Sequence, residues 1–108
     1  MKTDRVYVQH ILDAIAQIEE YTEDVDRETF KSNRMLQDAT VRQIEIVGEA
    51  SRQLSDSFRA ETNGIPRRAV IGMRNRIVHD YLNIDLDTVW EVVQGDLPTL
   101  KSRLSEIT

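Results

Sequence analysis

Hydrophobic residues at the start of the chain recur with the period of an α-helix. Between residues 4 and about 22 the apolar stripe, at spacings of mostly three and four residues, consists of Val8, Ile11, Leu12, Ile15 and Ile18. This spacing predicts an amphipathic helix with one buried face. His10 falls on the opposite face, so we expect its side chain to be exposed.

A polar stretch over residues 23–33 separates this helix from a second one. Ser32 or Asn33 can cap the second helix, which should run to about residue 55. Its expected buried stripe, interrupted by Gln43, consists of Leu36, Ala39, Val47, Ala50 and Leu54. Residues 24–31 and 55–61 are candidates for a short extra helical turn.

Two further helices are predicted after the turn signal Asn63-Gly64. Pro66 suits the first turn of a helix, where a missing N–H costs nothing, and this helix should span residues 66 to about 79. The last helix begins near Asp85, a candidate N-cap. Its expected apolar side consists of Leu86, Trp90, Val93, Leu97, Leu100, Leu104 and Ile107. Gly95 and Pro98 interrupt this helix, but the stripe stays in phase across them, which favours one kinked helix over two unrelated ones.

The pattern as a whole predicts an all-α fold, because we find no alternating strand pattern and no repeat. A chain of 108 residues that is 40% apolar can bury one modest core, so we expect a single helical domain over residues 1–108. The predicted architecture is a four- to five-helix up-and-down bundle with short loops.

Composition narrows the classes of function. The chain has no cysteine, hence no disulfide framework, thiolate metal site or cysteine nucleophile. No segment resembles a signal peptide or approaches the roughly 20 apolar residues of a membrane span, so we expect a cytoplasmic protein that does not contact a membrane. The two histidines fall at no recognisable metal spacing, so we expect neither a metal nor another cofactor.

Charge is distributed unevenly along the chain. The net charge of −5 argues against a surface coated for nucleic acid, but residues 62–79 contain four arginines and no acid, which leaves −9 for the remainder. The arginines are Arg67, Arg68, Arg74 and Arg76. A solvated helix face would explain such a basic segment as well as a binding surface would.

Arg74 occupies a position where the helical period calls for a hydrophobic side chain. At 100° per residue it lies about 40° from Val70, inside an apolar arc that also contains Met73 and Ile77. A guanidinium there requires a partner, a cleft or another subunit, because burying it unpaired is costly. His79 lies on the flank of the arc, and the two side chains could converge over a shared cavity.

Arginine and histidine together suit metal-free cleavage of RNA. Histidine can act as acid or base near neutral pH, and arginine matches phosphate oxygens. RNA carries its own nucleophile, the 2′-hydroxyl, so the enzyme needs only proton transfer and stabilisation of charge. Purely structural roles also remain open: His79 could interact with the last carbonyls of a helix, and Arg74 could form a buried ion pair.

The segment RNRIVHDY, residues 74–81, resembles the R-x4-H-x-Y signature of HEPN domains, specifically the HepT-like group. The likeness extends over nearly the whole chain. It includes the segments MLQDA (35–39), GEA (48–50), Ile65-Pro66 and DLDTVW (85–90).

The resemblance implies a bundle that dimerises through the signature helix, with a cleft at the interface, and a metal-independent endoribonuclease acting as a toxin. It implies that His79 is the general base or acid, that Arg74 binds the scissile phosphate and that Asn75 orients substrate or histidine. Arg67, Arg68 and Arg76 would extend the RNA-binding surface. Tyr81 would accept AMP from a partner nucleotidyltransferase, the antitoxin. We expect that partner to be a separate chain, because this one has no Gly-Ser followed by an Asp-x-Asp pair, the metal-binding pattern of such a transferase.

Two other functions stay open at the level of sequence. The same basic cleft could hold a nucleotide phosphate in a non-catalytic regulatory subunit of a neighbouring nucleotidyltransferase. Alternatively, the chain could be a helical dimerisation module in which Arg74 merely pairs with an acid such as Glu49.

Overall fold

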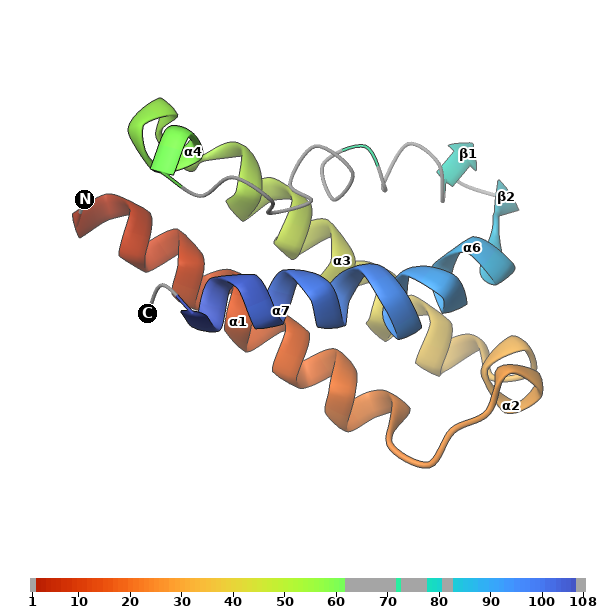
Figure 1. Cartoon of the computed structure of the whole chain (residues 1–108). Helices are drawn as coiled ribbons and strands as arrows, with labels where there is room; N and C mark the ends of the chain where they lie inside the picture. Colours follow the sequence, from red (N-terminus) through yellow and green to blue (C-terminus); the bar gives the residue numbers. More distant parts are fainter. Residues whose placement is uncertain (1, 62–71, 73–77, 81–82, 107–108) are drawn as a thin grey trace.

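The computed structural model describes residues 2–61, 72, 78–80 and 83–106. Helices and one two-stranded ladder make up this part of the chain (Figure 1). The helices before the ladder are α1 (Lys2–Thr22), α2 (Arg27–Lys31), α3 (Arg34–Arg52) and α4 (Asp56–Glu61). The strands are β1 (Val78–Asp80) and β2 (Asn83–Ile84), followed by α6 (Leu86–Glu91), the π-helical segment η1 (Val92–Asp96) and α7 (Leu97–Glu106).

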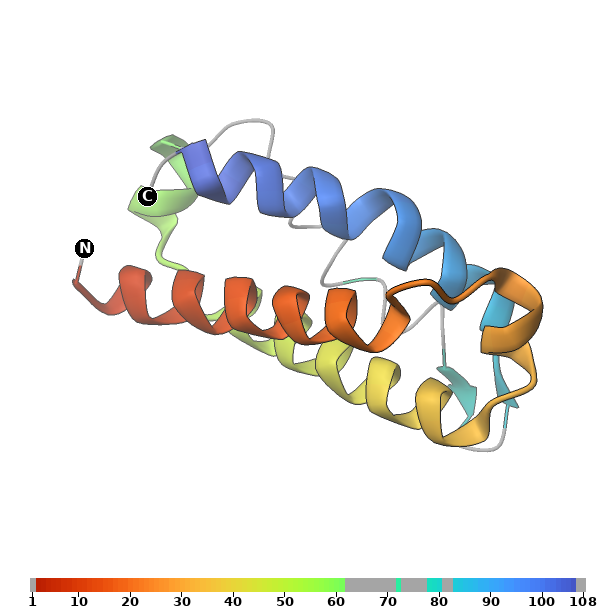
Figure 2. The same cartoon turned by 90° about the horizontal axis from the view of Figure 1, so that it is seen from below.

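The centre of the fold is the antiparallel pair α1 and α3, which make the most extensive contact between elements. The helix formed by α6, η1 and α7 lies across one face of this pair, as the two views in Figures 1 and 2 show. Apolar side chains from all these elements form one buried cluster. The helical class predicted from the sequence is therefore confirmed.

The predicted stripe of α1 is confirmed except at Leu12, which is half-buried, and that of α3 is only partly right. Val8, Ile11, Ile15 and Ile18 are at most 2% exposed, and His10 is exposed as expected. In α3, Val47, Ala50 and Leu54 are buried, but Leu36 and Ala39 are only half-buried. The buried side also includes Thr40, Val41, Ile44 and Ser51. Over the first half of α3 the predicted stripe is therefore about one position out of phase with the buried residues.

Short helices form at both candidate positions. Asp26 caps α2 by accepting a hydrogen bond from the Thr29 N–H at 2.8 Å, and Asn33 caps α3 through the Leu36 N–H at 3.0 Å. Before α4, the Ser55 hydroxyl accepts a hydrogen bond from the Phe58 N–H at 3.1 Å. Each cap supplies an acceptor for an N–H that has no partner inside its helix.

The last helix is continuous from residue 86 to 106, with η1 in its middle. The Leu97 N–H bonds the Val92 carbonyl, five residues back, which widens the turn immediately before Pro98. A widened turn suits this position, because proline cannot donate a hydrogen bond to the preceding turn. The prediction of one interrupted helix is confirmed. Of the predicted apolar side, Val93, Leu97, Leu100 and Leu104 are buried, Leu86 and Trp90 are only half-buried, and Ile107 lies outside the described residues. Val89 and Val92 are also buried, although the predicted stripe did not contain them.

Candidate functional site

The residues nominated by the sequence fall largely outside the described part of the structure. Those outside it are Arg67, Arg68, Arg74, Asn75, Arg76 and Tyr81. His79 is the exception, since its backbone lies in the middle of β1. Their proposed convergence in a cleft therefore stays a prediction.

The helix predicted over residues 66 to about 79 does not extend to His79, and this corrects the sequence-based expectation. Val78–Asp80 is a strand that pairs antiparallel with β2, with Val78 opposite Ile84 and Asp80 opposite Asn83. The register is irregular between the two pairs. β-Branched residues such as Val78 and Ile84 favour extended backbone, but strands of three and two residues are too short to show an alternating pattern.

The ladder is joined to the core through β2. Ile84 is half-buried and packs against the buried cluster. Directly after it, Asp85 caps α6, because its carboxylate accepts the Thr88 N–H at 3.1 Å, as the sequence predicted. The strand containing His79 is thus hydrogen-bonded to a strand that continues at once into α6.

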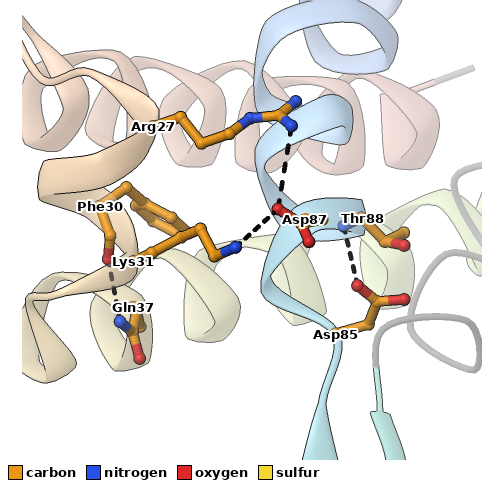
Figure 3. Close-up of polar contacts among 7 residues, drawn as sticks. All are labelled: Arg27, Phe30, Lys31, Gln37, Asp85, Asp87 and Thr88. Carbon is orange, nitrogen blue, oxygen red and sulfur yellow. Dashed lines mark hydrogen bonds and ion pairs between the residues drawn. The ribbon is translucent and has the colours of Figure 1, made fainter.

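Helix α6 contacts α2 through an aromatic pair and through charged side chains, and Figure 3 shows the charged contacts. Asp87 forms ion pairs with Lys31 at 3.2 Å and with Arg27 at 3.8 Å. Beside them, the rings of Phe30 and Trp90 lie 5.4 Å apart between centroids. No pattern in the sequence predicts this α2–α6 contact, although the DLDTVW segment supplies its α6 side.

A hollow of about 470 Å³ lies elsewhere, between α1 and α3. Tyr7 and His10 line it from α1, with their rings 5.9 Å apart. From α3, Arg42 and Glu45 contribute opposite charges and pair at 3.8 Å. Because both signs are present, the hollow has no clear preference for an anion.

Several charged groups in the described part of the chain form ion pairs at the surface. Glu49, the suggested partner of Arg74, is exposed and pairs with Arg52 at 3.8 Å. No group of three or more His, Asp or Glu side chains among the described residues is placed to hold a metal ion. None of the described helices is long and apolar enough to cross a membrane.

Comparison with known proteins places these features in a family. The family model described as ribonuclease HepT-like matches residues 11–107, which include the signature segment, the ladder and the start of α6. The chain belongs to the HepT-like ribonuclease family. The resemblance read from the sequence is therefore confirmed.

Individual members of the HepT-like family support the assignment. The probable ribonuclease HepT of Thermococcus cleftensis is 32% identical over 106 residues, which cover 98% of this chain and 96% of the relative. A Methanocaldococcus jannaschii protein named "Gamma-glutamylcyclotransferase and putative RNase" is 42% identical over 106 residues. That match covers 98% of this chain but only 48% of the relative's length. No solved structure matches the chain significantly.

Proposed function

We propose that this HepT-like chain is a metal-independent endoribonuclease that acts as the toxin of a toxin–antitoxin module. The observation that carries the proposal is the match of the ribonuclease family model to residues 11–107. The ribonuclease names of relatives aligned over 93% or more of this chain support it further.

The proposed reaction uses the 2′-hydroxyl of RNA as nucleophile. The 2′-oxygen bonds to phosphorus and the bond from phosphorus to the 5′-oxygen breaks, while a base takes the 2′-proton and an acid protonates the leaving oxygen. His79 serves as base or acid in this scheme. Arg74 stabilises charge on the phosphate oxygens, and Asn75 orients the substrate or the imidazole.

The proposed site lies between two copies of the chain. A homodimer would surround the Arg74 guanidinium with a polar cleft rather than with apolar core, which removes the cost of burying its charge unpaired. Arg67, Arg68 and Arg76 would then contact the RNA backbone beside the cleft.

The proposed switch is the transfer of AMP to Tyr81 by a separate nucleotidyltransferase. The phenolic oxygen bonds to the α-phosphorus of ATP, pyrophosphate leaves, and the phenol proton goes to solvent. The attached nucleotide adds bulk and negative charge near the cleft, and both repel RNA.

Intact mass and RNA cleavage test the toxin and its switch together. The protein is purified alone and after co-expression with a nucleotidyltransferase encoded beside it. We expect cleavage by the first sample, and a gain of one or more AMP units on Tyr81 with loss of cleavage in the second. Absence of cleavage by the first sample, at a concentration where it is dimeric, contradicts the proposed activity.

Substitution of the nominated residues tests the assignment of the site. His79→Ala and Arg74→Ala should each relieve growth inhibition and abolish cleavage while the circular dichroism spectrum stays unchanged. His10→Ala is the matched control, because His10 is the other histidine of the chain and is exposed on α1. Full toxicity of either signature variant would overturn the assigned role of that residue.

A further inference from the structure

Asp87 is the meeting point of two cations from a different helix. Its carboxylate forms ion pairs with Lys31 at 3.2 Å and with Arg27 at 3.8 Å. The three side chains are between 39% and 53% exposed. Exposed ion pairs of this kind usually contribute little to the free energy of folding. Stability alone is therefore a weak reason for the arrangement.

Helix α2, which supplies both cations, is firmly fixed to the rest of the bundle. Phe30 is fully buried in the core, and its carbonyl accepts a hydrogen bond from the Gln37 side chain of α3 at 2.9 Å. Asp26 closes the other end of α2 as its N-cap. The cations of α2 thus extend from a rigid element toward α6 (Figure 3).

On the α6 side, Asp87 follows closely after β2, the strand that pairs with the strand of His79. Asp87 is in the first turn of α6, and Ile84, three residues before it, ends β2. β2 pairs with β1, whose central residue is His79. The neighbours of His79, Val78 and Asp80, pair with Ile84 and Asn83 of β2. We therefore expect a change in the direction of the first turn of α6 to reach the backbone of His79 through these two pairs.

We propose that Asp87 is a positioning residue, whose ion pairs with Lys31 and Arg27 fix the first turn of α6 and, through the β1–β2 ladder, the place of His79. The expected effect of Asp87 on catalysis rests on the proposed function. Its expected effect on the β1–β2 ladder rests only on the contacts described above.

Steady-state cleavage of RNA by full-length Asp87→Asn tests the catalytic consequence. Asparagine keeps the size of the side chain and removes its charge. We expect kcat to fall about threefold, since an exposed ion pair can bias a local equilibrium only by a factor of this order. The thermal midpoint should stay near the wild-type value, because Asp87 is half exposed and lies outside the buried cluster. KM should also stay near the wild-type value, because we expect the substitution to act on the position of His79.

A charge exchange tests whether the ion pair itself is responsible. In an Arg27→Gln background, Lys31→Glu and Asp87→Lys should each lower kcat, and the two together should restore it. Glu19→Gln is the matched control, because Glu19 and Lys101 form an ion pair of similar exposure at 3.0 Å between α1 and α7. Its kcat should equal that of the wild type. The proposal is overturned if Asp87→Asn behaves like Glu19→Gln, or if the exchange fails to restore kcat.

Hydrogen exchange separates this proposal from the proposed function. If the wild-type dimer cleaves no RNA, the ribonuclease assignment fails, and the exchange rates of the paired amides in β1 and β2 decide about Asp87. We expect them to rise about threefold in Asp87→Asn and to stay unchanged in Glu19→Gln. Equal rates in both variants would overturn the positioning role as well.

Discussion

Asp4 is a buried carboxylate at the start of α1 whose partner lies just before α4. It accepts the Ser55 backbone N–H at 2.8 Å and the Ser55 hydroxyl at 2.7 Å. The backbone bond, followed by the hydroxyl bond, lowers the pKa of Asp4, and burial only partly opposes this. Because the folded pKa lies below the unfolded value of about 3.9, Asp4 stabilises the fold above that pH and loses this effect as the pH falls through the folded pKa.

Asp4→Asn should therefore flatten the acid dependence of stability. Asparagine can still accept the Ser55 N–H and can donate to the Ser55 hydroxyl, so the contact survives without a titrating group. We expect the free energy of unfolding, measured with urea, to fall less between about pH 5 and pH 2.5 in the variant than in the wild type. Some slope should remain, because the Thr29 N–H also lowers the pKa of Asp26. Parallel curves for the two proteins would contradict this role.

At the scale of elements, the cap at Asp85 determines how well α6 begins. Replacement by alanine removes the acceptor of the Thr88 N–H and should lower the free energy of unfolding by about 1 kcal/mol. Asp85→Asn is the control, since asparagine caps nearly as well. Chemical denaturation of both variants measures the difference, and equal losses would show that charge rather than capping is at work.

The π segment offers a second test at this scale. Gly95 is exposed, and a Cβ added there meets no atom within 4 Å. Gly95→Ala should raise the free energy of unfolding by about 0.5–1 kcal/mol, because alanine loses less backbone entropy than glycine in a helix. Thermal denaturation checks this. A loss of stability would mean that η1 needs glycine for its backbone conformation.

Sequence periodicity predicted the long helices well, because each buries one face over many turns. Val8 and Ile15 were placed correctly for this reason, and the caps at Asn33 and Asp85 follow from side-chain chemistry. Burial of Val92 was missed, although it follows the buried Val89 by three residues, a spacing typical of one helical face. The polar residue Gln37 is buried because its amide bonds a carbonyl of α2, which no hydrophobic pattern reports.

The candidate site was less accessible to such reasoning. His79 could be named from residue chemistry and the signature spacing, but the strand that contains it forms by pairing with β2, which no local pattern indicates. Helical periodicity therefore predicts a helix that wrongly extends to about residue 79. The role of Asp87 arises from contacts between α2 and α6, which are more than 50 positions apart, and no local pattern indicates them.

The whole described chain is built around one buried cluster, so it should unfold as one unit. Trp90 is the only tryptophan and packs beside Phe30, whereas far-ultraviolet circular dichroism reports mainly α1 and α3. We expect the two signals to give the same denaturation midpoint. Phe30→Leu should shift both midpoints together, with a loss of about 1 kcal/mol. Separate midpoints would indicate that the α2–α6 corner unfolds independently.

The contact between Asp4 and Ser55 also bears on the timing of folding. It joins residues 51 positions apart, at the end of the α1–α3 pair opposite the α2 turn. Contacts near that turn need only short loops to close, whereas this one needs the longest loop in the pair and should form late, after the folding barrier. Interactions absent from the transition state slow unfolding without speeding folding. Asp4 therefore governs how long the native state lasts more than how quickly it is reached.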